Sequence, residues 1–179
     1  MDEVGLIITG SEEGFLKFST LGSIDPRNLP GMEVVLLSDT PIYGVVSCLP
    51  PHVLSAEEKE KVIETKNLFI DVGMNEEDAL RTVPPGTAGV FKGGFYKLGN
   101  EQISGKSFDN RVCVSVMLDA AIRLKEKKLD IDLYVLASVQ EELGTRGAVA
   151  GAYSTEPDYS IVIDATHGGT PDSPKTGTY

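Results

Sequence analysis

The chain is organised around residues 133–148, which read LYVLASVQEELGTRGA. The first seven of these residues are mostly apolar, as in a buried strand, and the run ends in two adjacent carboxylates, Glu141 and Glu142. A turn bracketed by glycines follows, and helical residues begin at about Arg146. In open α/β sheets, ligands bind just beyond the carboxyl ends of the strands. We therefore expect these two acids to lie where chemistry takes place.

Two further acids occupy comparable positions. The apolar run Tyr159–Asp164 predicts a second strand that ends in an acid. With a helix at Arg146–Tyr153, the strands 131–139 and 159–164 would form a β-α-β unit, whose strands are parallel with a right-handed crossover. Upstream, Asp109 stands at the front of residues 110–127, whose apolar side chains recur at helical spacing. The pattern predicts an α/β fold.

The chain before about Gln102 has a different character, because short β-like runs alternate with turns. Residues 4–9 and 15–18 predict a hairpin. Further strands are expected at Met32–Ser38, Tyr43–Leu49, Asn67–Val72 and Thr87–Phe91. Ser55 with Glu58 fits a capping box, and Asn75 fits an N-cap, so each predicts a short helical segment. Many short strands at close spacing favour a small barrel over an open sheet.

The composition excludes some classes of partner. The chain has 16 basic and 27 acidic residues, and its formal net charge of −11 argues against nucleic acid, whose phosphates attract a basic surface. The N-terminus has no basic segment, so no signal peptide is predicted. No apolar run approaches the ~20 residues of a membrane span. We expect a cytoplasmic protein without a membrane partner, in which Cys48 and Cys113 are reduced.

Neither end of the sequence resembles a natural domain border. Residues 1–3 lead directly into the apolar run 4–8, as if the chain started partway through a strand. The last residue, Tyr179, follows the second acid-bearing strand after a short polar segment. The sequence therefore looks truncated at both ends.

Each acid has an ordinary explanation when it is taken alone. Asp109 can cap the helix that follows it, Glu141 and Glu142 can be solvated loop acids, and Asp164 can form a turn. Their joint placement instead predicts a metal site. Side chains alternate along a strand, so one of the paired glutamates can bind metal while the other faces a bound water as general base. Carboxylates accept zinc, manganese or cobalt, and a bridging carboxylate can hold two ions about 3.5–4 Å apart.

Three separated motifs resemble one known family. They are Gly105-Lys106-Ser107-Phe108-Asp109-Asn110-Arg111, the segment 139–148 quoted above, and Ile163-Asp164-Ala165-Thr166. Over essentially its whole length the chain is similar to the dinuclear metallo-aminopeptidases of the glutamyl, deblocking and tetrahedral aminopeptidase family. Members are often labelled cellulase M or endoglucanase. The resemblance implies part of a metallopeptidase catalytic domain, at residues 1–8 and 99–179, with a small β-barrel domain inserted at 9–98.

The resemblance also implies a role for each acid of the motifs. Asp109 would bridge two divalent metal ions (zinc, cobalt or manganese), Glu142 would bind the first ion and Asp164 the second. Glu141 would be the general base, and Asp2 would be the acid that orients a metal-binding histidine. The implied partners are a peptide substrate and further copies of the chain, which would assemble through the barrel domain.

The sequence departs from the family pattern in three ways. Asn110 stands where many members have a second Asp, and we expect its role to be structural. The first histidine ligand would fall immediately before Met1, and another belongs to a C-terminal part that the 179 residues do not contain. The sequence has two histidines. We interpret His52 as a surface or packing residue, and His167 as a loop residue or a substitute ligand. We expect weak or partial metal binding and negligible turnover.

Three functions are compatible with these observations. An aminopeptidase would use the metal ions and the Glu141 carboxylate. A glycoside hydrolase needs two acids beside the scissile bond, but the chain has no Trp to stack a sugar and Asp109 would have no role. The third possibility is a non-catalytic truncated fragment that acts only in subunit contacts. A chelator would abolish the peptidase activity and leave a simple glycosidase unaffected.

Overall fold

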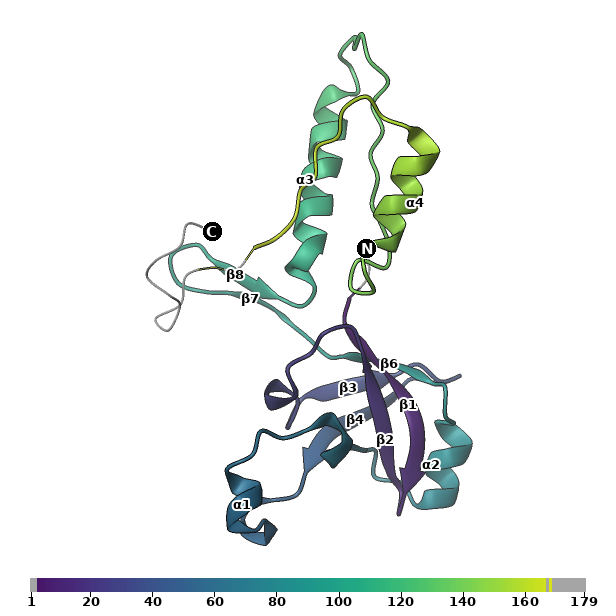
Figure 1. Ribbon diagram of the computed structural model, residues 1–179, viewed down its shortest axis with the longest axis vertical. Coiled ribbons are helices and arrows are strands. Elements are labelled where there is room, and N and C mark those ends of the chain that lie inside the picture. The colour runs from purple at the N-terminus through teal and green to yellow at the C-terminus, as the bar shows by residue number, and fades with distance from the viewer. Residues whose placement is uncertain (1–2, 167, 169–179) are drawn as a thin grey trace. The chain divides into compact units, whose positions relative to one another are not determined.

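The computed structural model describes residues 3–166 and 168, and the chain divides into two compact units, Glu3–Gly93 and the residues from Gly94 onward (Figure 1). The prediction of an α/β fold with a small β-barrel is confirmed.

Among the described residues, no helix is both long enough and apolar enough to cross a bilayer. Both cysteines are free thiols; Cys113 is buried and Cys48 is half-buried.

The first unit is a closed barrel of six antiparallel strands. In chain order they are β1 (Gly5–Glu12), β2 (Phe15–Leu21), β3 (Glu33–Leu36), β4 (Ile42–Cys48), β5 (Leu68–Asp71) and β6 (Ala88–Phe91). Around the barrel the order is β1-β2-β5-β4-β3-β6, and β6 pairs back with β1 where Gly89 lies opposite Leu6. Each strand therefore has a hydrogen-bonded neighbour on both sides, which removes the exposed edges of an open sheet. All six strands coincide with runs that the sequence predicts.

The core fills the inside of the barrel because side chains alternate along each strand. In β4, for example, Val46 is buried while Tyr43 and Val45 face outward. Gly44 points inward, where a Cβ atom would lie 2.6 Å from Cγ2 of Ile70, so this position has room for glycine alone. The buried cluster consists of Leu6, Ile8, Leu16, Phe18, Leu29, Val34, Leu36, Val46, Leu68, Ile70, Ala79, Val83 and Phe91.

Short helical segments connect the barrel strands. They are η1 (Pro26–Asn28), η2 (Pro51–Val53), α1 (Ala56–Lys59), η3 (Thr65–Asn67) and α2 (Glu76–Thr82). The predicted capping box of Ser55 and Glu58 is confirmed at α1, and Asn75 caps α2 by accepting from the N–H of Asp78 at 2.9 Å.

The side chain of Glu76 fixes the first turn of α2 against the β1–β2 turn. Its Oε2 accepts hydrogen bonds from the Ser11 hydroxyl at 2.9 Å and from the Gly14 N–H at 2.6 Å. Gly14 has a φ of 88°, and a Cβ atom there would lie 2.2 Å from the Met74 carbonyl oxygen. The turn therefore requires glycine for its conformation and for the close approach of the chain before α2.

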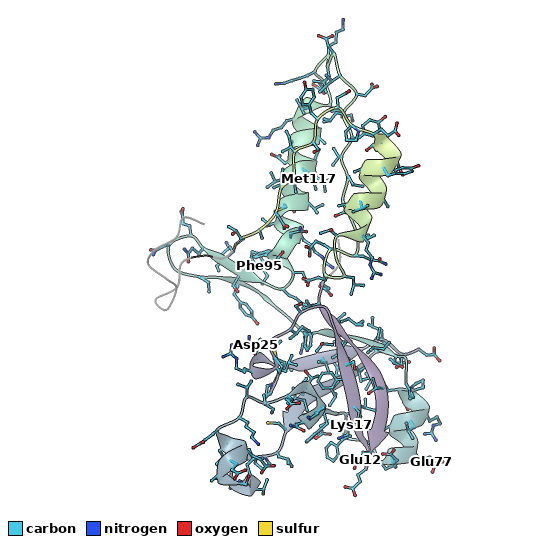
Figure 2. The ribbon with its side chains drawn as sticks, viewed as in Figure 1. Glu12, Lys17, Asp25, Glu77, Phe95 and Met117 are labelled. Atoms are coloured by element: carbon cyan, nitrogen blue, oxygen red, sulfur yellow. The ribbon has the colours of Figure 1, made fainter. Side chains whose placement is uncertain are left out.

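Charged pairs on the barrel surface are exposed. Lys17 lies 3.2 Å from Glu12 beside the β1–β2 turn (Figure 2). The hydrogen bond from the Arg27 guanidinium lowers the pKa of Asp25, and the hydrogen bond from the Ser55 hydroxyl lowers the pKa of Glu58. Exposed pairs of this kind contribute little to stability, because water and salt screen them. The apolar core therefore supplies most of the barrel's stability.

The second unit contains a hairpin and two helices: β7 (Phe95–Lys97), β8 (Ile103–Gly105), α3 (Phe108–Leu124) and α4 (Arg146–Thr155). The Phe95 ring packs edge-to-face on Phe108 with 6.1 Å between centroids, which joins the hairpin to the start of α3. The sequence pattern does not predict this hairpin, because three-residue strands are too short to show an alternating pattern.

The predicted β-α-β unit is only partly formed. Helix α4 is confirmed, but the segments 131–139 and 159–164 lie outside any sheet in the part of the chain that the structure describes. Ile161 and Val162 are 88% and 87% exposed. An apolar run becomes a strand only when another backbone offers a ladder of hydrogen bonds, and the run itself does not contain that partner.

The helix predicted at residues 110–127 is present as α3, and several of its large apolar side chains are exposed. Cys113 is buried, whereas Val112, Val116 and Ile122 are exposed.

The compact barrel unit, residues 3–93, begins and ends earlier than the expected 9–98. The reason at its start is that residues 5–8 pair with both β2 and β6, so they are part of the barrel wall.

We predict that Leu16→Ala lowers the free energy of unfolding of the barrel by about 2–5 kcal/mol, because this β2 side chain is fully buried and its removal leaves a cavity. Urea unfolding followed by circular dichroism measures the change. The control is Leu37→Ala, whose side chain is 53% exposed and whose effect should stay within about 0.5 kcal/mol. Equal losses in the two variants would contradict this core.

Candidate active site

Asp109 lies in the irregular first turn of α3. The backbone is non-helical at Asp109 (φ −78°, ψ 109°) and at Asn110 (φ −118°, ψ 36°), and the peptide bond between them is cis. Regular helix begins at Arg111, whose N–H donates to the Ser107 carbonyl at 3.2 Å. The Asp109 carboxylate is exposed and accepts no hydrogen bond from the described residues. The interpretation of Asp109 as a helix cap is therefore wrong, since Asp109 lies inside the first turn and Ser107 occupies the N-cap position.

Glu141 and Glu142 lie in a tight turn that leads into α4. The carbonyl of Glu141 accepts from the N–H groups of Gly144 at 2.9 Å and Thr145 at 3.0 Å. Gly144 has a φ of 99°, the left-handed region that glycine adopts without strain. Both glutamate side chains are half-buried, so neither is a fully solvated loop acid.

Gly147 closes this turn against the end of the apolar run. Its N–H donates to the Val139 carbonyl at 2.9 Å, and a Cβ atom on Gly147 would lie 2.3 Å from that same oxygen. Only glycine allows the first turn of α4 to come so close to the preceding backbone. The glycine at 147 therefore determines where the two glutamates are held.

A side-chain hydrogen bond joins the first and third acidic motifs. The Nδ2 group of Asn110 donates to Oδ1 of Asp164 at 2.7 Å, and the N–H of Ala165 donates to the same oxygen at 2.8 Å. A structural role is expected for Asn110 from the sequence, but this contact is not. The signal that could have indicated it is the position of Asn110 directly beside a predicted metal ligand.

The structure thus brings two of the three motifs into contact. Among residues 3–166 and 168, no group of three or more His, Cys, Asp or Glu side chains is close enough to hold a metal ion. Asp2 and His167 lie outside the described residues, and His52 is exposed on η2 of the barrel. The carboxylates of Asp109, Glu142 and Asp164 are hard oxygen donors that suit a divalent cation, although the described residues do not close a cage around one.

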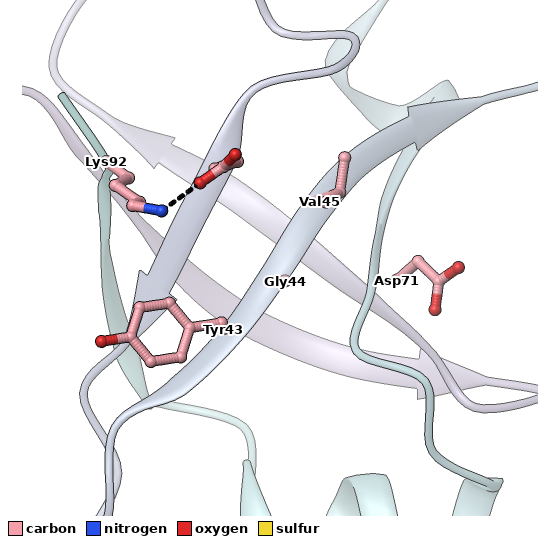
Figure 3. Close-up of a pocket in the computed structure, with 6 residues that line it drawn as sticks. Tyr43, Gly44, Val45, Asp71 and Lys92 are labelled. Carbon is pink, nitrogen blue, oxygen red and sulfur yellow. Dashed lines mark hydrogen bonds and ion pairs between the residues drawn. The ribbon is translucent and has the colours of Figure 1, made fainter. Parts of the chain in front are cut away.

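A separate shallow hollow of about 290 Å³ lies on the outer wall of the barrel (Figure 3). Its lining residues are Glu33, Tyr43, Gly44, Val45, Asp71 and Lys92. Lys92 pairs with Glu33, and its Nζ lies 5.9 Å from the centroid of the Tyr43 ring. None of the predicted catalytic or metal-binding residues lines this hollow, so it is distinct from the acidic motifs.

Known proteins resemble the chain over nearly its full length. The profile of the M42 glutamyl aminopeptidase family matches residues 1–178. A lysyl aminopeptidase of Pyrococcus furiosus is 31% identical over 171 residues, which cover 93% of this chain and 49% of that protein.

Solved structures of aminopeptidases also resemble this chain over nearly its full length. A TET aminopeptidase from a marine sediment archaeon, Thaumarchaeota archaeon SCGC AB-539-E09, superposes with a TM-score of 0.87 at 33% identity, covering 96% of this chain and 50% of that one. The TET1 peptidase of Pyrococcus horikoshii, described as assembling into a tetrahedron or a large octahedral shell, gives 0.77 at 35% identity, with 99% and 54% covered. The chain spans about half the length of these relatives.

We predict that Gly147→Ala opens the turn that carries the two glutamates, because the added methyl group collides with the Val139 carbonyl. Overpacking of this kind costs about 1–3 kcal/mol. Hydrogen exchange of the backbone amides at 144–149 should accelerate accordingly. Gly99→Ala is the matched control, since a Cβ atom at Gly99 meets nothing within 4 Å. Unchanged exchange in Gly147→Ala would contradict the close approach.

Proposed function

The chain belongs to the M42 glutamyl aminopeptidase family, and from this premise we propose that its acidic motifs serve the metal-dependent removal of N-terminal residues from peptides. The observation that carries the proposal is the family match over residues 1–178. The hydrogen bond between Asn110 and Asp164 supports it, because it joins two of the motifs that the chemistry needs at one place.

In this proposal three carboxylates, from Asp109, Glu142 and Asp164, hold two divalent ions of zinc, cobalt or manganese. A bound divalent ion supplies Lewis-acid chemistry, which polarises a scissile carbonyl and makes water a stronger nucleophile. Like-charged carboxylates repel one another, so a set of acids stays apart unless a cation lies between them.

The Glu141 carboxylate acts as general base in the proposed reaction. It takes a proton from the attacking water and then delivers it to the leaving amine of the cleaved peptide bond. Its half-buried position at the start of the turn favours this role over that of a solvated acid. Asp2 is proposed to orient a metal-binding histidine.

We further propose that the 179 residues alone bind metal weakly and turn over little substrate. The sequence contains two histidines, and one of them, His52, is exposed on the barrel. Carboxylates by themselves discriminate poorly among divalent metals and lack the nitrogen ligands that zinc and cobalt favour. We therefore expect the 179 residues to bind divalent metal ions with low affinity and to hydrolyse peptides slowly.

We predict that cobalt titration of the chain, followed by calorimetry, gives binding that Asp164→Asn weakens by at least about tenfold, because the substitution removes a charged ligand. Glu141→Gln should bind cobalt as the unmodified chain does, since a general base is not a ligand. Hydrolysis of an aminoacyl-4-nitroanilide, however small, should disappear with a chelator. It should fall about 100-fold or more in Glu141→Gln and stay unchanged in the control Glu126→Gln.

Three results would count against this function. Cobalt binding that is identical in Asp164→Asn and the unmodified chain would remove Asp164 from the proposed site. Anilide hydrolysis that survives the chelator would remove the metal from the mechanism. Chelator-resistant hydrolysis of a glucan, with no action on the anilide, would favour the glycoside hydrolase instead.

The proposed partners are a peptide substrate and further copies of the chain, with no nucleic acid or membrane. Assembly into an oligomer is supported by the TET1 peptidase of P. horikoshii, which can assemble into a tetrahedron or a large octahedral shell. On the barrel, Tyr43 and Val45 present apolar surface outward from β4, with exposed fractions of 66% and 42%. Aromatic side chains of this kind are enriched at the centres of protein interfaces.

We predict that light scattering coupled to size exclusion finds an oligomer of the chain, and that Tyr43→Asp shifts it to smaller species, because a charge is costly to bury in an apolar contact. The control is Tyr159→Asp, whose side chain is 93% exposed in the second unit. A monomeric unmodified chain, or an equal shift in both variants, would refute assembly through this face of the barrel.

A further inference from the structure

We propose that residues 131–139 and 159–164 are open strand edges that bind an extended polypeptide. The polypeptide to which we assign them is the half of an M42 aminopeptidase that lies outside the match with this chain. Residues 131–139 and 159–164 are called the open segments below. Their binding of a polypeptide goes beyond the proposed function, since it needs no metal ion.

The open segments carry apolar side chains of the buried type that are accessible to solvent. The four consecutive apolar residues 133–136 are each between 45% and 63% exposed, and Ile161 and Val162 are 88% and 87% exposed. Consecutive side chains of a strand point to opposite faces, so a continuous apolar run is typical of a strand that is covered on both faces. Extensive exposed apolar surface of this kind marks a site of interaction.

The backbone of the open segments is also unpaired. Among the described residues, one backbone hydrogen bond reaches them, from the Gly147 N–H to the Val139 carbonyl at 2.9 Å, and no sheet includes them. Covering the apolar side chains would remove water from the other N–H and C=O groups, which then need new partners. An extended polypeptide supplies those partners by adding a strand, whereas a lipid or a small apolar molecule does not.

Helix α4 already occupies one side of residues 131–139. A Cβ atom at Gly151 would lie 2.4 Å from Cδ2 of Leu136, and one at Gly147 would lie 2.3 Å from the Val139 carbonyl oxygen. A helix in such close contact leaves no room for a further layer between itself and the segment, because packed layers are about 10 Å apart. The polypeptide is therefore expected at the edges of the open segments that α4 does not cover.

The share of the relatives that the chain covers indicates which polypeptide this is. On the Thaumarchaeota TET aminopeptidase, 96% of this chain superposes, yet the chain covers only 50% of that protein. The same fold therefore occurs there together with as much polypeptide again. A second copy of this chain is a poorer source of strands, because its six barrel strands already have two neighbours each.

The test uses a chimera in which the full chain of 179 residues is joined to the half of the Thaumarchaeota protein outside the superposition, in the order of that protein. Hydrogen exchange of the amides in the open segments is compared between the chimera and the chain alone. Exchange should be rapid in the chain alone and about 100-fold or more slower in the chimera, since paired amides exchange only when the pairing opens. Amides of β1, which pair within the barrel, report folding in both.

Val135→Pro tests whether the backbone of the open segments is what pairs. Proline has no N–H, and residue 135 has no backbone hydrogen bond to lose among the described residues, so thermal unfolding of the chain alone should not change. In the chimera, most of the protection at 131–139 should disappear. Val62→Pro is the matched control, because this valine is 65% exposed and lies outside helix and strand on the barrel. It should leave exchange at 131–139 as in the unmodified chimera.

Two results would overturn the proposal. One is equally fast exchange of the open segments in the chimera and in the chain alone, with the β1 amides protected in both. The other is slow exchange in the chain alone, because the edges would then be paired internally or by a second copy. If the chimera does not fold, the same half is added to the chain as a separate polypeptide, and an absence of protection then overturns the proposal. None of these results bears on the metal chemistry, which the cobalt titration tests separately.

Discussion

Strand backbones need hydrogen-bonding partners, and this requirement decides which parts of the chain form a sheet. In the barrel the requirement is met internally, since β1 pairs with β2 on one side and with β6 on the other. Closure gives all six strands two neighbours and encloses one apolar core. In the second unit, the apolar segments 131–139 and 159–164 have no such neighbour among the described residues. Their side chains consequently remain exposed, although the sequence is of the buried type.

The acidic motifs therefore depend on local devices more than on a sheet. The turn 139–147 is held by the carbonyls of Val139 and Glu141 and by the close approach that Gly147 permits. Asp164 is held by the side chain of Asn110. The turn holds Glu141 and Glu142, and one side-chain hydrogen bond holds Asp164. Among the described residues, these local contacts do not bring three acidic side chains close enough together to bind one metal ion.

Predictions from the sequence succeeded where the signal is local and failed where a strand needs a partner from elsewhere in the chain. Barrel strands such as β3 and β4 were found because each is a short apolar run between strong turn formers, and the capping residues Ser55 and Asn75 act through their immediate neighbours. The hairpin β7–β8 was missed because its strands have three residues each. The strand prediction for 131–139 was wrong in the described chain, because apolar composition indicates a tendency to be buried and does not supply a partner.

By itself, the sequence determined the barrel strands, the two long helices, the order of the acidic motifs and the net charge of −11. These are properties of local pattern and composition, which act over a few residues. The tertiary structure alone decided that β6 closes on β1, that α4 approaches Val139 through Gly147, and that Asn110 reaches Asp164. Each of these joins residues whose spacing in the sequence carries no signal of contact, because hydrogen bonds and steric fit between distant segments depend on where the whole chain places them.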